Sequence, residues 1–308
     1  MPWRKRGLIY RPDGSIKWSQ THAQAPAPLK INDTTIRVFF STRNKQGLTQ
    51  TGYVDLDIDN PKIIKNICKE PFIRLGKPGM HNDRGSMFGS IVVEKEEIKI
   101  YFTGWHVPIT VDYECTIGLA TTKNLDKIDY IFKGPLIYKN IYEPYWVGAP
   151  CVIKEKEQYK MWYISTFDNV EYNGKLEPVY HIKYATSLDG IDWKQSNEPI
   201  IKCDYDGEAL GRPWVINEEV KYKMWFSKRG TKDYRSSSGE HYNMAYAESE
   251  NGIDWIRKDN EVGISTSENG WDSEMIEYGS VYHDERRKYM FYNGNGFGRE
   301  GFGYAEYI

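Results

Sequence analysis

The sequence predicts an all-β fold built from repeated units, and three observations lead to this prediction. A segment of similar pattern returns roughly every 60 residues, most clearly as HIKYATSLDGIDWKQ at 181–195 and NMAYAESENGIDWIRK at 243–258. Each copy follows a similar aromatic segment, YKMWYIST at 159–166 and YKMWFSKR at 222–229. No long stretch has the periodicity of an amphipathic helix. We therefore expect short strands throughout the chain.

Five units can be counted along the chain, and each contains short runs rich in Tyr, Val, Ile and Trp that alternate apolar and polar residues. Turns of Gly, Asp, Asn and Lys separate the runs, which is the pattern of strands joined by hairpins. The five units span residues 27–58, 88–138, 149–195, 212–258 and 278–308.

The two ends of the chain predict how these units are arranged. The fifth unit ends after three strands, while WRKRGLIYR at 3–11 resembles the fourth strand of other units, such as YIFKGPLIYK at 130–139. Repeated four-stranded units are typical of a β-propeller, and we expect the N-terminal strand to complete the last blade and close the ring. The prediction is a single five-bladed β-propeller domain over residues 1–308. An open pair of β-sheets or a β-solenoid is the alternative.

Composition argues against several classes of function. The chain has 308 residues with 10 Trp, 24 Tyr and a formal net charge of −2, so it lacks the overall positive charge typical of nucleic-acid binding. No apolar run approaches the roughly 18 residues of a membrane span, and the first residues carry no apolar signal core. We expect a cytoplasmic protein with no nucleic-acid partner and no membrane span.

The cysteines and histidines predict neither a metal site nor a cofactor. Cys68, Cys115, Cys151 and Cys203 lie far apart with no C-x-x-C pair, and the six histidines show no H-E-x-x-H spacing. Buried, reduced thiols are the expected state, because a free cysteine behaves as a small core residue.

The functional site is expected where the innermost strands of a propeller and the loops before them converge, at one mouth of the central channel. In this chain the segments concerned are 21–29, 80–90, 142–150, 205–213 and 271–280. They concentrate acidic residues and potential partners: Asp83, Glu143, Glu208, Asp272, Glu274, Glu277, Arg84, Arg212 and His22.

Three features carry a resemblance to a known group of enzymes. They are the hairpins SLDGIDW at 187–193 and SENGIDW at 249–255, the M-W-Y and M-W-F strands, and a proline that opens an inner strand at Pro150 and Pro213. In these features the chain resembles, over nearly its whole length, the five-bladed propeller glycosidases of families 32, 43, 62, 68 and 130. It also resembles a smaller group of uncharacterised glycosidase-like proteins with H-A-Q, G-R-P and D-S-E-M-I-E-Y segments. The resemblance implies a glycan-processing activity.

The resemblance also implies where catalytic acids would lie. In family 43 an acid precedes the inner-strand proline of the first and third blades, and a Glu-Gly-Pro supplies the general acid in the fourth. The corresponding places here are interpreted as Ala27-Pro28, Ala149-Pro150 and Gly211-Arg212-Pro213, none of which is acidic. Catalytic acids are therefore expected in the preceding loops.

Hydrolysis of a glycoside needs one protonated carboxyl group to assist the leaving oxygen and one ionised group to activate water or attack carbon. Glu208 is the expected general acid, because its loop corresponds to the blade that supplies this acid in the related families. Asp83 or Glu143, across the channel, is the expected base or the partner that tunes the pKa of the acid. The alternative for each acid is a structural hydrogen bond to a loop amide or an arginine.

The remaining candidates form a substrate-binding set. Arg212 heads an inner strand, where its guanidinium could hold a carboxylate or phosphate bidentately or, alternatively, pair with Glu208 for stability. Trp105, Trp146 and Tyr278 are the expected platforms for the C–H faces of a sugar. The other tryptophans, Trp162, Trp193, Trp225 and Trp255 among them, are expected to pack between blades. The full predicted set is His22, Gln24, Arg43, Arg84, Trp105, Trp146, Arg212, Arg229, Asp272, Glu274, Glu277, Tyr278 and Asn295.

Two functions of different classes fit this pattern. The first is a glycoside hydrolase-like enzyme, or a phosphorylase or transferase on the same fold, that acts on a small sugar in the mouth of the channel. That sugar is a neutral, an acidic or a phosphorylated carbohydrate. The second is a non-catalytic carbohydrate-binding propeller, which the absence of the family acids at Ala27, Ala149 and Gly211 allows. Turnover of a glycoside separates the two.

Overall fold

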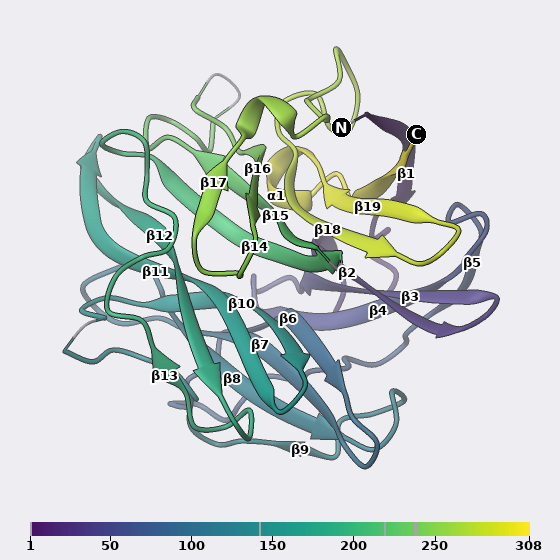
Figure 1. Ribbon diagram of the computed structural model, residues 1–308, viewed down its shortest axis with the longest axis horizontal. Helices are drawn as coiled ribbons and strands as arrows, with labels where there is room; N and C mark the ends of the chain where they lie inside the picture. Colours follow the sequence, from purple (N-terminus) through teal and green to yellow (C-terminus); the bar gives the residue numbers. More distant parts are fainter. Residues whose placement is uncertain (1, 142, 219, 237–238) are drawn as a thin grey trace.

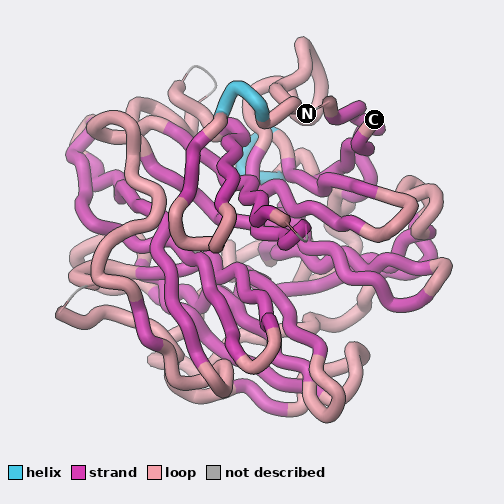
Figure 2. Tube along the Cα trace, in the orientation of Figure 1, coloured by secondary structure: helices cyan, strands magenta, loops and turns pink. Residues whose placement is uncertain are grey.

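The chain is nearly all β-structure, as the sequence predicts. The computed structural model describes residues 2–141, 143–218, 220–236 and 239–308, so that Tyr142 of the predicted inner segments lies outside this part. Within these residues the chain forms twenty β-strands, a 3-10 turn at Asp259–Glu261 and one short helix, α1 (Asn295–Gly298) (Figure 2). Among the helices of the described residues, none has the length and apolar character needed to cross a membrane.

The strands pair antiparallel in groups of four. The first group is β2 (Thr21–Asn32), β3 (Thr35–Arg43), β4 (Thr49–Asp57) and β5 (Ile64–Ile67), and the second is β6 (Gly85–Val93), β7 (Ile98–His106), β8 (Glu114–Thr122) and β9 (Tyr130–Ile131). The third is β10 (Val147–Glu155), β11 (Gln158–Tyr172), β12 (Lys175–Ser187) and β13 (Lys194–Gln195), and the fourth is β14 (Ala209–Glu218), β15 (Lys221–Arg229), β16 (Asn243–Ser249) and β17 (Trp255–Arg257). The last contains β18 (Glu277–His283), β19 (Lys288–Asn293), β20 (Phe302–Tyr307) and β1 (Trp3–Tyr10). A single parallel pair, Thr49 with Gly85, joins the first two groups into one sheet.

The first strand of the chain lies beside the last. β1 pairs antiparallel with β20, from Trp3 opposite Tyr307 to Tyr10 opposite Phe302, and the two termini are close together in Figure 1. Trp3 is buried and packs edge-on against Trp225, with ring centroids 6.1 Å apart. The pairing predicted for residues 3–11 is therefore present.

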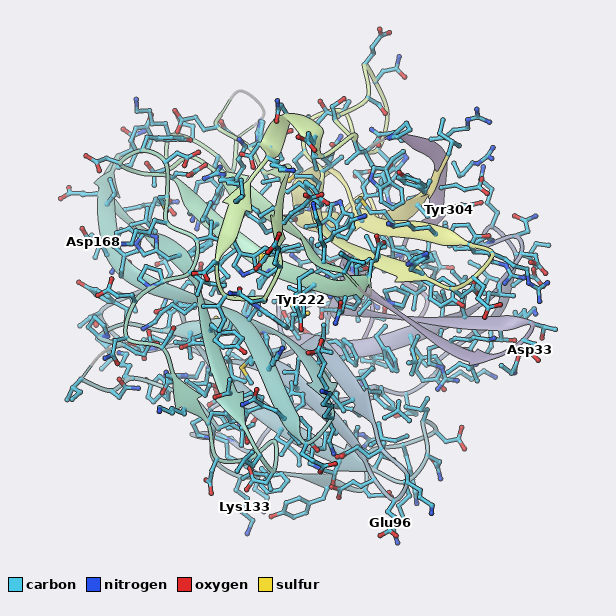
Figure 3. All side chains as sticks on the ribbon, viewed as in Figure 1. Asp33, Glu96, Lys133, Asp168, Tyr222 and Tyr304 are labelled. Carbon is cyan, nitrogen blue, oxygen red and sulfur yellow. The ribbon has the colours of Figure 1, made fainter. Side chains whose placement is uncertain are left out.

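The first strands of the five groups contact one another in a cycle, because β2 contacts β6, β6 contacts β10, β10 contacts β14, β14 contacts β18, and β18 contacts β2. The turns that follow β2 and β6, which carry Asp33 and Glu96, lie at the rim of the molecule (Figure 3). Each first strand is also interrupted by a bulge near its start, between Gln24 and Ala27, Phe88 and Ser90, Gly148 and Cys151, Gly211 and Trp214, and Glu277 and Ser280. A bulge re-aims the side chains around it.

The bulges correct one sequence interpretation. Ala25, Ala149 and Tyr278 have positive φ values of 50°, 51° and 56° at equivalent places in their bulges. The equivalent of Ala149-Pro150 on β2 is therefore Ala25-Pro26, and the assignment to Ala27-Pro28 is wrong. The segment APAP offers two registers in sequence, and the pairing of β2 with β3 selects the earlier one.

The repeated S-x-(D/N)-G turn connects neighbouring groups. Gly190 and Gly252 have φ of 77° and 78°, which favours glycine, and their carbonyls accept hydrogen bonds from Tyr101 Oη (3.0 Å) and Trp162 Nε1 (2.8 Å) of the preceding group. A Cβ atom at Gly190 would lie 2.5 Å from Tyr101 Oη. The motif that reveals the repeat in sequence therefore packs one unit against the next.

The tryptophans expected between blades pack between groups. Trp162 and Trp225 are fully buried in apolar clusters that combine strands of adjacent groups. Trp255 lies edge-on to Trp162 at 6.4 Å, and Trp193 lies edge-on to Tyr101 at 5.8 Å. Edge-to-face pairs add to the stabilisation from burial.

Candidate functional site

A cavity of about 240 Å³ lies where the bulges of the first strands converge. Its walls include the bulge residues Ala149, Arg212 and Tyr278, and no carboxylate is among its described lining residues. A larger, open groove of about 750 Å³ lies along β17, at the outer edge of the fourth group. The cavity is the candidate site because it is enclosed by strands of several groups, whereas the groove follows surface turns.

Aromatic rings form a continuous part of the cavity wall. Trp105 stacks on Tyr113 with centroids 5.6 Å apart, Tyr113 contacts Trp146 at 5.7 Å, and Trp146 contacts Tyr180 at 5.4 Å. The Tyr180 hydroxyl is hydrogen-bonded to that of Tyr242, which also lines the cavity. Such faces suit the C–H surface of a sugar ring.

Three lining residues have buried N–H groups without a hydrogen-bond partner in the described structure: Arg43 Nε, Trp105 Nε1 and Arg212 Nε. Buried polar groups are normally paired, so each unpaired donor needs an explanation. Neither Arg43 nor Arg212 lies within ion-pairing distance of a carboxylate among the described residues. Arg43 and Arg212 therefore bring two guanidinium groups without an acidic partner to the wall of the cavity.

Arg212 is 2 % exposed and is held by backbone carbonyls instead of an acid. Its Nη1 donates to the carbonyls of Pro26 (2.9 Å) and Tyr278 (2.8 Å), and its Nη2 donates to that of Gly89 (3.4 Å). Burial lowers the pKa of Arg212 to about 10, so the group remains charged at neutral pH. The Nε–H of Arg212 has no partner among the described residues, and a pairing with Glu208 is not formed.

Arg43 is part of the cavity wall, whereas Arg229 lies behind it. Arg43 lines the cavity and donates from Nη2 to Gln24 Oε1 at 3.1 Å. Arg229 is buried behind the wall, where it stacks on Tyr234 at 3.7 Å and donates from Nε to Tyr242 Oη at 3.2 Å. Arg229 therefore supports two lining tyrosines.

The structure does not bring Asp83, Glu143 and Glu208 together in the cavity wall. Glu208 is 1 % exposed, and Arg257 donates two hydrogen bonds to its carboxylate. One runs from Nη1 to Oε2 at 2.9 Å and the other from Nη2 to Oε1 at 2.6 Å. The amide of Asp204 also donates to Glu208 Oε2 at 2.7 Å. These contacts match the structural alternative for Glu208, and its catalytic role stays a prediction.

Glu143 and Asp83 are engaged elsewhere in a similar way. Glu143 Oε1 lies 2.8 Å from Lys183 Nζ and accepts a hydrogen bond from Tyr163 Oη at 2.8 Å. Asp83 is half-buried and accepts a hydrogen bond from the backbone amide of Gly79 at 2.8 Å. Their catalytic roles also stay predictions, without support from contacts with the cavity.

Among the predicted binding residues, Trp105, Trp146, Tyr278, Arg43 and Arg212 line the cavity. The others are placed around it or away from it. Asp272 pairs with Lys5 at 2.7 Å, Asn295 Oδ1 accepts from the amides of Glu274 and Met275, and the side chains of Glu274 and Arg84 are exposed. Gln24, Glu277 and His22 are buried close to Arg43, and burial, followed by repulsion from Arg43, lowers the pKa of His22 to about 3.

Several lining residues were not predicted from the sequence: Tyr113, Tyr180, Tyr234, Tyr242, Phe297 and Arg235. Tyr234 and Arg235 follow Asp233, whose Oδ2 accepts a hydrogen bond from Tyr172 Oη at 2.9 Å, on the extended β11–β12 hairpin. Asp168, on that hairpin, lies at the opposite edge of the view from Asp33 (Figure 3). A usable signal in the sequence was length, because the stretches between the second and third repeat segments, 167–180 in the third unit and 230–242 in the fourth, are longer than 44–48 in the first.

Comparisons with known proteins place the chain in a family with two mycobacterial proteins. A search of family models found no match. The chain is 35% identical over 307 residues to the uncharacterised proteins Rv1502 and MT1551 of two Mycobacterium tuberculosis strains, and the match covers 99% of this chain and of each relative. The chain belongs to the family of these uncharacterised proteins.

Solved structures similar to this member of the family are glycosidase-like. A "Glycoside hydrolase" matches with a TM-score of 0.76 at 15% identity over 98% of this chain and 90% of that chain. A structure described as "The GH130 family of mannoside phosphorylases contains glycoside hydrolases that target beta-1,2 mannosidic linkages in Candida mannan" matches with a TM-score of 0.71 at 15% identity, over 99% and 93% of the chains. A thermostable family-43 glycoside hydrolase matches with a TM-score of 0.65 at 15% identity, over 95% and 90%. The fold is therefore of the glycoside hydrolase-like β-propeller type.

Proposed function

We propose that this protein is a glycan-processing enzyme whose cavity binds a small carbohydrate. The observation that carries the proposal is one cavity whose wall combines a continuous run of aromatic rings with three residues that keep an unpaired N–H group, Arg43, Trp105 and Arg212. A sugar presents apolar C–H faces and many hydrogen-bond acceptors, and this combination matches both. The fold shared with glycoside hydrolases agrees with the proposal.

The architecture that goes with this function is a single five-bladed β-propeller domain over residues 1–308. We infer that the five strand groups are its blades and that β1 closes the ring in the last blade. Support comes from the cycle of contacts among the first strands, from the bulge shared by all five, and from the pairing of β1 with β20. A cytoplasmic location stays a prediction.

The arginines favour a substrate that carries an anionic group, or phosphate as a second substrate. Arg212 and Arg43 both line the cavity, and the Nε–H of each has no hydrogen-bond partner among the described residues. An arginine edge can hold two oxygens of a carboxylate or phosphate. Hydrolysis, phosphorolysis and glycosyl transfer all fit such a site.

A non-catalytic carbohydrate-binding propeller is the second candidate. It is favoured by Ala25, Ala149 and Arg212, which occupy the bulge places where the resemblance to family 43 implies acids. Binding without turnover distinguishes this candidate from the enzyme.

The test is a screen of simple α- and β-glycosides, with and without inorganic phosphate, that measures both released sugar and binding by calorimetry. The enzyme proposal predicts turnover of at least one glycoside, and binding without any turnover would support the second candidate. Neither binding nor turnover across the screen would contradict both.

A pair of tryptophan variants tests the cavity itself. Trp105→Ala removes a lining ring and should weaken binding of the sugar found in the screen, because the apolar surface buried between the ring and the sugar is lost, at about 25 cal/mol per Å². Trp255→Ala, at a packing position outside the cavity, is the matched control and should lower the melting temperature without changing affinity. Equal affinity in wild type and Trp105→Ala would show that the sugar binds elsewhere.

A further inference from the structure

Each first strand has one position just before its bulge, and in β18 this position is held by an acidic residue, Glu277. Glu277 pairs with Asn293, and its equivalents on the other first strands are Gln24, Met87, Gly148 and Gly211, each opposite the corresponding residue of the second strand. Met87, Gly148 and Gly211 line the cavity. Glu277 therefore occupies the place in the fifth group that faces the cavity in three other groups.

The hydrogen bonds of Glu277 leave one carboxyl oxygen without a partner. The side chain is fully buried, Oε1 accepts from Asn293 Nδ2 at 2.8 Å, and Oε2 has no partner among the described residues. The amide of Ala25 donates to Asn293 Oδ1 at 2.9 Å, which fixes the orientation of the asparagine so that its NH2 faces Glu277. Oε2 is thus the oxygen that can carry and release a proton.

Among the described residues, four titratable groups interact electrostatically with this carboxyl group. They are Arg43 from β3, Arg229 from β15, and the hydroxyls of Tyr242 and Tyr278. Burial raises the pKa of Glu277 to about 8, against the opposing effects of the Asn293 hydrogen bond and the two arginines. The carboxyl group is therefore mostly protonated at pH 7. Arg43, Tyr242 and Tyr278 also line the cavity, so three of the four neighbours of the carboxyl group belong to the cavity wall.

We propose that Glu277 is the catalytic proton donor of the cavity, supplying from the fifth group of strands the acid that the glycosidase-like families carry on other blades. This inference rests on the proposed function. As the bond between the anomeric carbon and the leaving oxygen breaks, its electron pair stays on that oxygen, which takes the proton from Glu277 Oε2. The anomeric carbon bonds to an oxygen of water or phosphate, and the resulting Glu277 carboxylate regains a proton from solvent or from the attacking water. Asn293 is the positioning residue, because its NH2 holds Oε1 and leaves Oε2 as the oxygen without a partner.

The decisive experiment compares leaving groups in Glu277→Gln, using a methyl glycoside and a 2,4-dinitrophenyl glycoside of the sugar that wild type turns over. A general acid typically contributes 10² to 10⁴-fold, so kcat/KM for the methyl glycoside should fall by at least about 100-fold. The dinitrophenyl glycoside leaves without protonation, so its turnover should stay within a few-fold of wild type. Glu155→Gln, a half-buried glutamate at the far end of β10, is the control and should change neither rate.

Each other outcome overturns the assignment. Equal activity of wild type and Glu277→Gln on both glycosides, or an equal loss on both, would show that Glu277 does not donate the proton. A wild-type protein without turnover of any glycoside would contradict the proposed function and the catalytic role together. Infrared titration of wild type and Glu277→Gln provides a readout without activity, since the proposal requires a protonated-carboxyl band that disappears above pH 8 in wild type alone.

Discussion

The buried contact between Glu208 and Arg257 yields a quantitative prediction about stability. Sequence reasoning makes Glu208 a catalytic acid, whereas the structure shows it in a bidentate pair with Arg257. Arg257 is also bound to Asp259 at 2.7 Å and to Asp204 at 3.0 Å. If Glu208 is removed, Arg257 therefore keeps two acidic partners, whereas removal of Arg257 leaves the Glu208 carboxylate without a cationic partner.

The expected magnitudes follow from that difference. In Glu208→Gln, Arg257 keeps its contacts with Asp259 and Asp204, so the loss should be close to that of one charged hydrogen bond, about 2 kcal/mol. In Arg257→Gln, the carboxylate of Glu208 stays buried with the Asp204 amide as its remaining donor, and Asp259 lies near as a like charge. Removing one partner of a buried pair costs about 3 to 5 kcal/mol, so this variant should be the less stable one.

Urea unfolding of wild type, the two single variants and the double variant measures these losses and the coupling between the side chains. The structural interpretation expects a favourable coupling energy and, in Glu208→Gln, turnover per folded molecule within a few-fold of wild type. A Glu208→Gln protein with full stability and a turnover reduced by orders of magnitude would refute it and restore Glu208 as the acid.

Three further predictions concern the ring, the buried acid and the central arginine. Deleting residues 1–11 exposes the edge of β20 and should cause unfolding or aggregation, whereas an unchanged melting temperature and a monomer in light scattering would contradict ring closure. Burial raises the pKa of Glu277 from 4.5 to about 8, so the folded state keeps a proton that the unfolded chain releases. The free energy of unfolding should therefore fall as pH rises from about 4.5 to about 8, by up to several kcal/mol at roughly 1.4 kcal/mol per pKa unit, and Glu277→Gln should lack this fall in urea titrations. Arg212→Lys should weaken binding of inorganic phosphate about tenfold or more in calorimetry, because Lys is a point charge, and unchanged affinity would place the anion elsewhere.

The strands were predictable because the repeat combines two local signals. Within each run, aromatic and β-branched residues alternate with polar residues at period two. The turns at Gly190 and Gly252 need a residue with positive φ, and the glycine that meets this need is visible in the sequence. The register of β2 was not predictable in the same way. Ala25-Pro26 and Ala27-Pro28 look alike locally, and the pairing with β3 decides between them.

The candidate site was only partly predictable, since its residues meet through tertiary packing. Arginine and aromatic residues on the inner strands or directly before them could be found from their place in each unit, as Arg212 on β14 and Trp146 before β10 show. Tyr234 lies in a connection of the fourth unit, and its role depends on packing against a hairpin of the third. For Glu208, the sequence shows an acid but gives no sign that Arg257, 49 residues later, neutralises it.

The contacts of Arg212 have a consequence for how the molecule unfolds. In repeat folds each unit touches only its neighbours, so that units can detach one at a time. β14 has β10 and β18 as neighbours in the cycle, yet Arg212 reaches across the centre to carbonyls on β2 and β6. If the first group of strands detached, Arg212 in the fourth group would lose the Pro26 carbonyl as a hydrogen-bond acceptor. Distant units thus depend on one another, and the chain should unfold in one cooperative transition.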